Sequence, residues 1–348
     1  MIKKFLKIIS IILISLILIL LLSTLVNQIL FKVEKNKYSI YGQYVKVNNK
    51  EMYLSVLGEG ENTIVILPGS GCVGSTILYR PLAKKLAENN KVIIIEYFGY
   101  GFSDDTYGDR TTQNIVQETR EALKSVCSEE EYILMPHSIS GIYALYWAMQ
   151  YPEEVKAIVG LDMTVAQLED EENINWDLLE EKAGLTKEDY YERSYPLILN
   201  PLVKETGIMR WVNSIYNKSS YETLKSYNLY SEQELQVLKK EYNRYPSIDL
   251  LKEYYKNTTN DNIEQLQNTN LPIDLPVLHF RASKSIEAMQ EYLGVDSISI
   301  INGTITNNDM QKIEIVEASH GLIYLDAINE IVEKTNQFIN NMSYINYN

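Results

Sequence analysis

The sequence predicts an α/β protein in which a mostly parallel sheet is flanked by helices, with an inserted helical segment and an N-terminal transmembrane helix. Three observations predict this class. Short unbroken apolar runs alternate with stretches of helical spacing as far as Leu161, which is typical of a parallel sheet covered on both faces. The alternation stops at Asp162, and strand-like runs resume only at Val277. Ahead of all these elements, residues 8–31 carry no charged side chain.

The uncharged N-terminal run is long enough to cross a bilayer, which takes about 20 apolar residues. A cleaved secretory signal has a shorter apolar region, about 7–15 residues, and ends at an A-x-A-like site that this sequence lacks. We therefore expect an uncleaved signal-anchor. Basic residues flank the run on both sides (Lys3, Lys4 and Lys7 before it; Lys32, Lys35 and Lys37 after it), so the positive-inside bias is slight. We expect a single-pass protein of the cell membrane whose body lies outside the cytoplasm.

The remaining elements follow in order along the chain. A hairpin is predicted first, with strands at 43–47 and 51–57 that turn at 48–50. Later strands are predicted at 63–67, 92–95, 132–135, 157–161, 277–280 and 313–316, and helices at 80–89, 112–126, 142–151 and 326–340. The predicted domains are therefore an anchor (1–34), a sheet core (35–162 and 272–348) and a helical cap or lid (163–271).

Composition excludes several classes of function. The net charge is −14 and no basic cluster lies beyond the flanks of the anchor, so we expect no nucleic-acid partner. The three histidines are scattered and neither cysteine has a ligand-like neighbour, so we expect no metal and no cofactor. Cys72 and Cys127 are too few for a disulfide framework, and whether they pair is left open. The oligomeric state is left open as well.

The stretch Pro136-His137-Ser138-Ile139-Ser140-Gly141 joins a predicted strand to a predicted helix with almost nothing in between. Such an abrupt turn can be a strained elbow that presents a nucleophilic serine. It can also be an ordinary turn in which Ser138 is the N-cap of the helix. The rest of the chain has to decide between these two interpretations.

The order of elements, together with four local stretches, resembles the α/β-hydrolase fold family between residue 43 and about residue 340. The stretch 96–104 is similar to the family's glycine-rich loop, and 67–71 stands where the family has its oxyanion loop. Residues 136–141 stand at the nucleophile elbow, and 318–321 at the loop of the catalytic histidine. The resemblance implies that Ser138 is the nucleophile, that His320 is the general base, and that the N–H groups of Ile139 and Ser70 form the oxyanion hole.

The sequence departs from the family pattern around the elbow and in the oxyanion loop. Pro136 and Ser140 flank Ser138 at two positions that favour glycine, and Pro68 stands where many members have histidine. Taking Ser140 as the nucleophile instead would place Ile142 at the crowded position, so Ser138 is the better choice.

His320 is the expected base because it follows the last strand and comes after the serine in the chain. His279 lies inside an apolar strand, and we expect a structural role for His137. The acid is less evident. Asp162 directly follows the sixth strand of the family pattern and is favoured over Glu287, which follows the seventh; Asp162 could also be a simple helix cap.

These residues predict acyl transfer to Ser138 on an uncharged ester-type substrate, with lipid-derived esters included, as in carboxylesterases and lipases. A serine at the elbow, where relatives have aspartate, disfavours the dehalogenase and epoxide-hydrolase branches. Two alternatives remain: a peptidase of the same fold, and a non-catalytic, membrane-tethered binding protein that has kept the fold.

Overall fold

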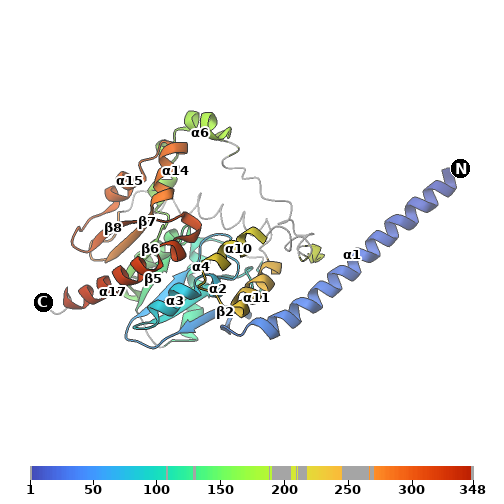
Figure 1. Ribbon diagram of the computed structural model, residues 1–348, viewed down its shortest axis with the longest axis horizontal. Coiled ribbons are helices and arrows are strands. Elements are labelled where there is room, and N and C mark those ends of the chain that lie inside the picture. The colour runs from blue at the N-terminus through green and yellow to red at the C-terminus, as the bar shows by residue number, and fades with distance from the viewer. Residues whose placement is uncertain are drawn as a thin grey trace.

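A computed structural model places most of the chain. The residues it describes are 2–106, 109–127, 131–187, 189, 205–208, 210, 218–244, 266 and 270–345. Figure 1 shows a sheet domain with helices around it and one long helix, α1 (Ile2–Tyr38), that projects away from it.

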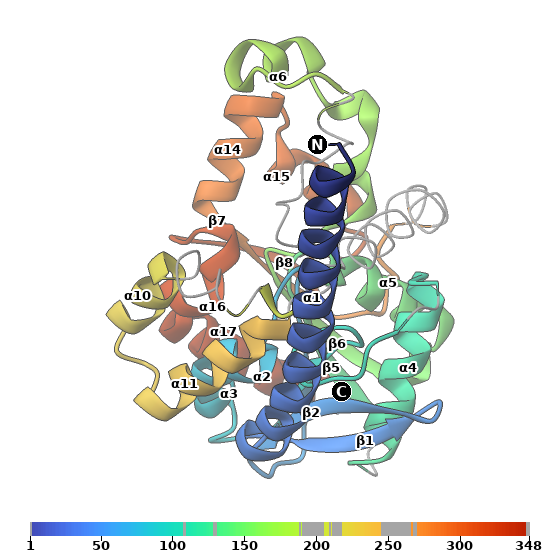
Figure 2. The same cartoon turned by 90° about the vertical axis from the view of Figure 1, so that its right-hand side faces the viewer.

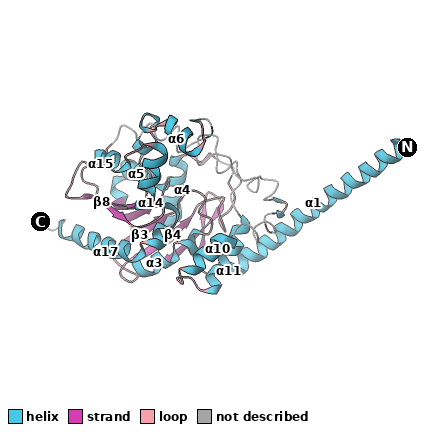
Figure 3. Cartoon of the chain, turned by 45° about the horizontal axis from the view of Figure 1, so that its top comes forward, coloured by secondary structure: helices cyan, strands magenta, loops and turns pink. Residues whose placement is uncertain are grey.

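The core of the domain is an eight-stranded sheet in the order β1-β2-β4-β3-β5-β6-β7-β8. Only β2 runs antiparallel to its neighbours; from β4 to β8 every pairing is parallel. Figure 3 shows the strands enclosed by helices. The bounds are β1 Gln43–Val47, β2 Lys50–Leu57, β3 Thr63–Leu67, β4 Lys91–Glu96, β5 Tyr132–Pro136, β6 Val155–Leu161, β7 Val277–Ala282 and β8 Gln311–Val316.

The central strands are buried along their whole length because helices cover both faces of the sheet. All residues of β3 and β5 are buried, which explains why these strands appear in the sequence as continuous apolar runs. Helices α3 (Arg80–Leu86) and α17 (Ile328–Ile345) pack together on one face, and α4 (Thr112–Lys124) and α5 (Ser140–Gln150) on the other (Figure 2). The sheet class predicted from the sequence is therefore correct.

Each predicted strand is present, with ends within two residues of the prediction. The predicted helices are present too, although α3 ends at Leu86 and α5 already begins at Ser140. Four further helices belong to the sheet domain: α2 (Ser75–Leu78), α14 (Ser283–Leu293), α15 (Ser297–Thr304) and α16 (Ile323–Asp326).

The connection between β6 and β7 corresponds to the predicted cap. Its described helices are α6 (Trp176–Ala183), α10 (Lys218–Ser226) and α11 (Glu232–Glu241), with short 3-10 turns at Ala166–Glu169, Glu171–Asn173 and Tyr242–Arg244. Much of the predicted cap lies outside the described residues. Helix α11 rests on α3 through Glu234, which pairs with Arg80 at 3.0 Å and with Lys84 at 2.6 Å.

Helix α1 is long and apolar enough to cross a membrane, with a mean hydropathy of 3.1 over its most apolar window. Its C-terminal part contacts the connection between β6 and β7. Arg210 donates to Asn27 and forms an ion pair with Glu34 at 2.7 Å, and the Ser23 hydroxyl donates to the Thr206 carbonyl. Helix α1 is thus tied to the domain at one end and projects freely at the other (Figure 1).

Candidate active site

Three side chains that the sequence singled out meet at one edge of the sheet. Ser138 follows β5, Asp162 follows β6 and His320 comes shortly after β8. Because these strands are parallel, their carboxyl ends lie at the same edge, where ligand sites of open α/β sheets are found. Topology therefore brings together residues that are 158 and 182 positions apart.

Ser138 occupies a strained turn. Its φ is +55°, in the left-handed region that non-glycine residues rarely adopt. The turn is held from the end of β6, since the Ser138 N–H donates to the Leu161 carbonyl at 3.3 Å and the Ser138 carbonyl accepts from Thr164 N–H at 2.8 Å. Strain of this kind persists only where neighbouring structure fixes it, and it occurs often at functional sites.

Ser140 is buried and its hydroxyl is already used. Its Oγ donates to the Pro68 carbonyl at 2.5 Å and accepts from the Tyr97 hydroxyl at 3.0 Å. The second serine therefore joins the elbow to the loop after β3. Only Ser138 of the two presents its hydroxyl to His320.

The His320 imidazole bridges the other two groups. Its Nε2 lies 2.8 Å from Ser138 Oγ, and its Nδ1 lies 2.6 Å from Asp162 Oδ2. A carboxylate only accepts, so Nδ1 carries the proton and Nε2 is free to accept the serine hydroxyl. The His320 side chain is half exposed, whereas Asp162 is buried, so the serine and imidazole can be reached from solvent while the carboxylate is protected.

Asp162 is held by four donors on its two oxygens. Arg281 Nη1 (2.7 Å) and Ala282 N–H (3.2 Å) reach Oδ1, while Ser285 Oγ (2.5 Å) and His320 Nδ1 reach Oδ2. Burial opposes its ionisation, but the His320 hydrogen bond and the Arg281 cation outweigh that effect and hold the pKa of Asp162 well below its usual range. The alternative acid, Glu287, is exposed on α14.

The two backbone donors expected to form an oxyanion hole are also present. Within the part of the chain that the structure describes, neither the Ser70 N–H nor the Ile139 N–H donates a hydrogen bond. Ser70 is exposed in the loop after β3, and Ile139 is the residue before α5. Gly69 brings this loop close to the elbow, because a Cβ added there would lie 3.2 Å from Ser138 Cβ. Glycine thus permits the approach.

The remaining histidines and the two cysteines do not take part in the series of Ser138, His320 and Asp162. His279 is buried within β7, and His137 is buried directly before Ser138. Cys72 and Cys127 are both free thiols, which answers the question that the sequence left open.

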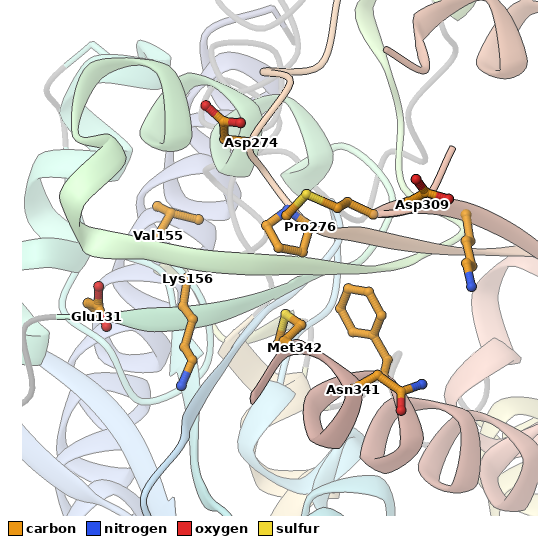
Figure 4. A pocket seen from close by; sticks show the side chains of 11 residues that line it. Glu131, Val155, Lys156, Asp274, Pro276, Asp309, Asn341 and Met342 are labelled. Carbon is orange, nitrogen blue, oxygen red and sulfur yellow. The ribbon is translucent and has the colours of Figure 1, made fainter. Parts of the chain in front are cut away.

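A pocket of about 240 Å³ lies at the opposite edge of the sheet (Figure 4). Its lining includes Glu131 and Pro276, which directly precede β5 and β7, and Val155, the first residue of β6. It therefore opens at the amino ends of the strands, away from Ser138.

Comparison with known proteins identifies the family. A family model described as the alpha/beta hydrolase fold matches residues 62–264, more than half of the chain. The chain belongs to the α/β hydrolase fold family.

Curated relatives match over shorter segments. YbdG of Bacillus subtilis, an uncharacterized protein, is 39% identical over 126 residues, which are 36% of this chain and 39% of that protein. The proline iminopeptidase of Saccharolobus solfataricus is 28% identical over 106 residues, which are 30% of this chain and 34% of the peptidase. The matches thus span about two fifths and one third of these relatives.

Solved structures of the α/β hydrolase fold superimpose on most of this chain. A variant of Vigna radiata epoxide hydrolase superimposes with a TM-score of 0.62 at 18% identity, covering 86% of this chain and 98% of that one. A likeness at this identity shows the fold.

Two contacts of the acid were not foreseen from the sequence. Arg281 lies near the end of β7 and Ser285 in the first turn of α14, and both bind Asp162. An arginine at the end of an apolar strand could have indicated the ion pair with Asp162, because a buried cation requires an acceptor.

Proposed function

We propose that this chain is a membrane-tethered serine hydrolase that cleaves an uncharged carboxylic ester through an acyl-enzyme on Ser138. One observation carries the proposal: Ser138 Oγ, both ring nitrogens of His320 and Asp162 Oδ2 form a continuous hydrogen-bonded series. This is the arrangement that activates a serine hydroxyl, which is otherwise a weak nucleophile.

The reaction proceeds in two halves. Ser138 Oγ attacks the ester carbonyl as its proton passes to His320 Nε2, and the resulting oxyanion accepts hydrogen bonds from the Ser70 and Ile139 N–H groups. His320 then protonates the departing alcohol. In the second half, His320 takes a proton from water, the hydroxide attacks the acyl carbonyl, and Ser138 leaves with the proton to release the acid.

Asp162 stabilises the imidazolium that forms in both halves. Because its pKa is held low, it is ionised at neutral pH and keeps the proton of His320 on Nδ1. Arg281 and Ser285 fix the carboxylate from the other side, so its orientation does not depend on His320 alone. A fixed carboxylate reduces the reorganisation that each proton transfer requires.

The domain arrangement supports an apolar substrate presented near a membrane. We propose that 1–34 anchor the chain, that 35–162 and 272–348 form the catalytic core outside the cytoplasm, and that 163–271 form a cap over it. Helix α1 qualifies as a membrane span by length and composition, and its end contacts Arg210 within the proposed cap. The anchor would thereby hold the proposed cap near lipid.

Epoxide hydrolases share this fold. A serine at the elbow, where the family resemblance implies an aspartate in that branch, disfavours epoxide hydrolysis by this chain. The iminopeptidase relative keeps peptidase activity as the second candidate. The same serine chemistry would serve both, so substrate turnover has to distinguish esters from peptides.

The test uses the full chain in detergent micelles with a fluorophosphonate probe, because truncation at Lys35 would remove Glu34 and its pairing with Arg210. We expect labelling in the wild type and in Ser140→Ala, and none in Ser138→Ala. Loss in Ser140→Ala alone would assign the nucleophile to the second serine. No labelling of a folded wild type would favour the non-catalytic binding protein. Short and long acyl esters beside N-terminal prolyl peptides then separate esterase from peptidase.

A further inference from the structure

His137, the residue before the proposed nucleophile, uses both ring nitrogens. Its Nδ1 lies 2.7 Å from the Tyr79 hydroxyl, and its Nε2 lies 2.8 Å from the backbone carbonyl oxygen of His320. Tyr79 in turn contacts the loop after β3, since the Gly69 N–H lies 3.3 Å and the Cys72 thiol 3.4 Å from its hydroxyl. His137 and Tyr79 together therefore connect the proposed oxyanion loop to the backbone of the proposed general base.

The direction of each hydrogen bond follows from chemistry. A carbonyl only accepts, so His137 Nε2 carries a proton. Burial and the neighbouring His320 lower the pKa of His137 to about 4, so the ring is neutral and has no second proton. Its Nδ1 must then accept the Tyr79 hydroxyl proton, and the Tyr79 oxygen accepts from Gly69 N–H and from the Cys72 thiol. All bonds run one way, from the oxyanion loop to the His320 carbonyl.

Water cannot substitute for these bonds. Tyr79 is 0% and His137 2% exposed, and Tyr324 of α16 packs against both rings, with centroid distances of 4.4 Å and 6.0 Å. Removing one group of this hydrogen-bond series would leave its partner buried without a hydrogen bond, at a cost of about 1–3 kcal/mol. The network is therefore suited to fixing the distance between the loop after β3 and the His320 backbone.

We propose that His137 is a positioning residue that sets the oxyanion loop and the His320 backbone at matched distances from Ser138. The inference rests on the proposed function, because it gives that site its geometry. Gly69 adjoins the proposed donor Ser70, and the carbonyl that His137 holds belongs to the proposed base itself. Both must be in place at once, since a displacement of about 1 Å in such a site can cost roughly 10² in rate.

Two substitutions separate the two contacts. In His137→Asn, the Asn oxygen takes the place of Nδ1 and keeps the Tyr79 bond, but the His320 carbonyl loses its donor. In His137→Gln, the longer amide reaches the His320 carbonyl and the Tyr79 bond is lost; Tyr79→Phe removes that same bond more gently. Tyr53→Phe, on β2 and outside this network, is the matched control for loss of a buried tyrosine hydroxyl.

The readouts are kcat, KM and the pH dependence of kcat/KM for an ester, in the full chain. Both His137 variants should lose about 10-fold to 10²-fold in kcat with KM nearly unchanged. Only His137→Asn should shift the acid limb of the pH profile, because only this variant leaves the His320 carbonyl without its donor. Tyr79→Phe should match His137→Gln, their double variant should be no worse than either, and Tyr53→Phe should resemble the wild type. Additive losses, or a shifted acid limb in Tyr79→Phe, would overturn the proposal.

An independent measurement separates this inference from the proposed function. The chain has three histidines, so selective ¹⁵N-histidine labelling gives a spectrum in which His137→Gln identifies one ring. We expect a neutral ring protonated at Nε2. A proton on Nδ1 would overturn the positioning proposal even if Ser138 is active. A wild type that is unreactive to the fluorophosphonate would instead overturn the proposed function, whatever the tautomer.

Discussion

Replacing Asp162 by asparagine tests the assignment of the acid most directly. Of the two oxygens, Oδ1 faces the Arg281 cation and the Ala282 N–H, and Oδ2 faces Ser285 and His320. An amide keeps one oxygen and turns the other into a donor. The oxygen stays with Arg281, because an NH₂ group against a buried cation would leave that charge without any acceptor. The NH₂ group therefore points at His320.

The consequence is a change of tautomer. With a donor opposite it, His320 Nδ1 must accept, so the proton of the ring moves to Nε2, 2.8 Å from Ser138 Oγ. In that form the imidazole cannot take the serine proton. The equivalent substitution in a serine protease lowers kcat by about 10⁴, and the same loss, about 5.5 kcal/mol of transition-state stabilisation, is expected here at neutral pH.

The assay is ester turnover and fluorophosphonate labelling by the full chain, normalised to folded protein. Glu287→Gln is the matched control, because it makes the same carboxyl-to-amide change on the exposed face of α14. We expect wild-type rates for it. If a folded Asp162→Asn kept its rate within about tenfold of the wild type while Glu287→Gln lost activity, the acid would be Glu287 and the tautomer argument would be wrong.

Two further predictions concern buried charges. Arg281→Met should lower the free energy of unfolding by about 3–5 kcal/mol in denaturant titration, because it leaves the Asp162 carboxylate buried without its cation; a loss below about 1 kcal/mol would contradict this. Glu241 of α11 and Glu96 of β4 are both fully buried beside Gly74. Burial raises the pKa of Glu96 to about 7, and burial together with Glu96 raises that of Glu241 well above its usual value. A carboxyl group whose pKa is higher in the folded than in the unfolded protein stabilises the fold at pH values below its unfolded pKa. This stabilisation is lost as pH rises through the folded-state pKa, about 7 for Glu96. The melting temperature should therefore fall between about pH 5 and pH 8 in the wild type, and fall less in Glu241→Gln.

Periodicity predicted the sheet because its strands are buried on both faces, so their residues are apolar without interruption. The start of helix α14, in contrast, leaves little signal in the sequence. It begins at Ser283 without a side-chain N-cap. Its end was visible, however: Gly294, in the left-handed region at φ +65°, is the glycine that commonly terminates a helix.

The choice between two acids could not be made from sequence. The ends of β6 and β7 are neighbours in the sheet, with Leu161 opposite Phe280, so the loops after both strands lie near His320. Distance along the chain cannot rank two such loops. The side-chain contacts of Asp162 with His320 and Arg281 could be found only in the folded arrangement. The same holds for His137 and Tyr79, which are 58 positions apart and belong to no common repeat.

The length of α1 bears on how the domain would meet a membrane. Its 37 residues extend for about 55 Å, whereas the hydrocarbon core of a bilayer is about 30 Å thick. If α1 spans a bilayer, close to half of the helix lies outside the hydrocarbon. The part that does so is marked by its contacts, since Ser23, Asn27 and Glu34 are bound by the connection between β6 and β7. Glu34 is buried between Arg210 and Lys240, and such a group would be costly within lipid. The membrane would therefore enclose the N-terminal half of α1, and the helix segment that follows it would be a packed part of the domain.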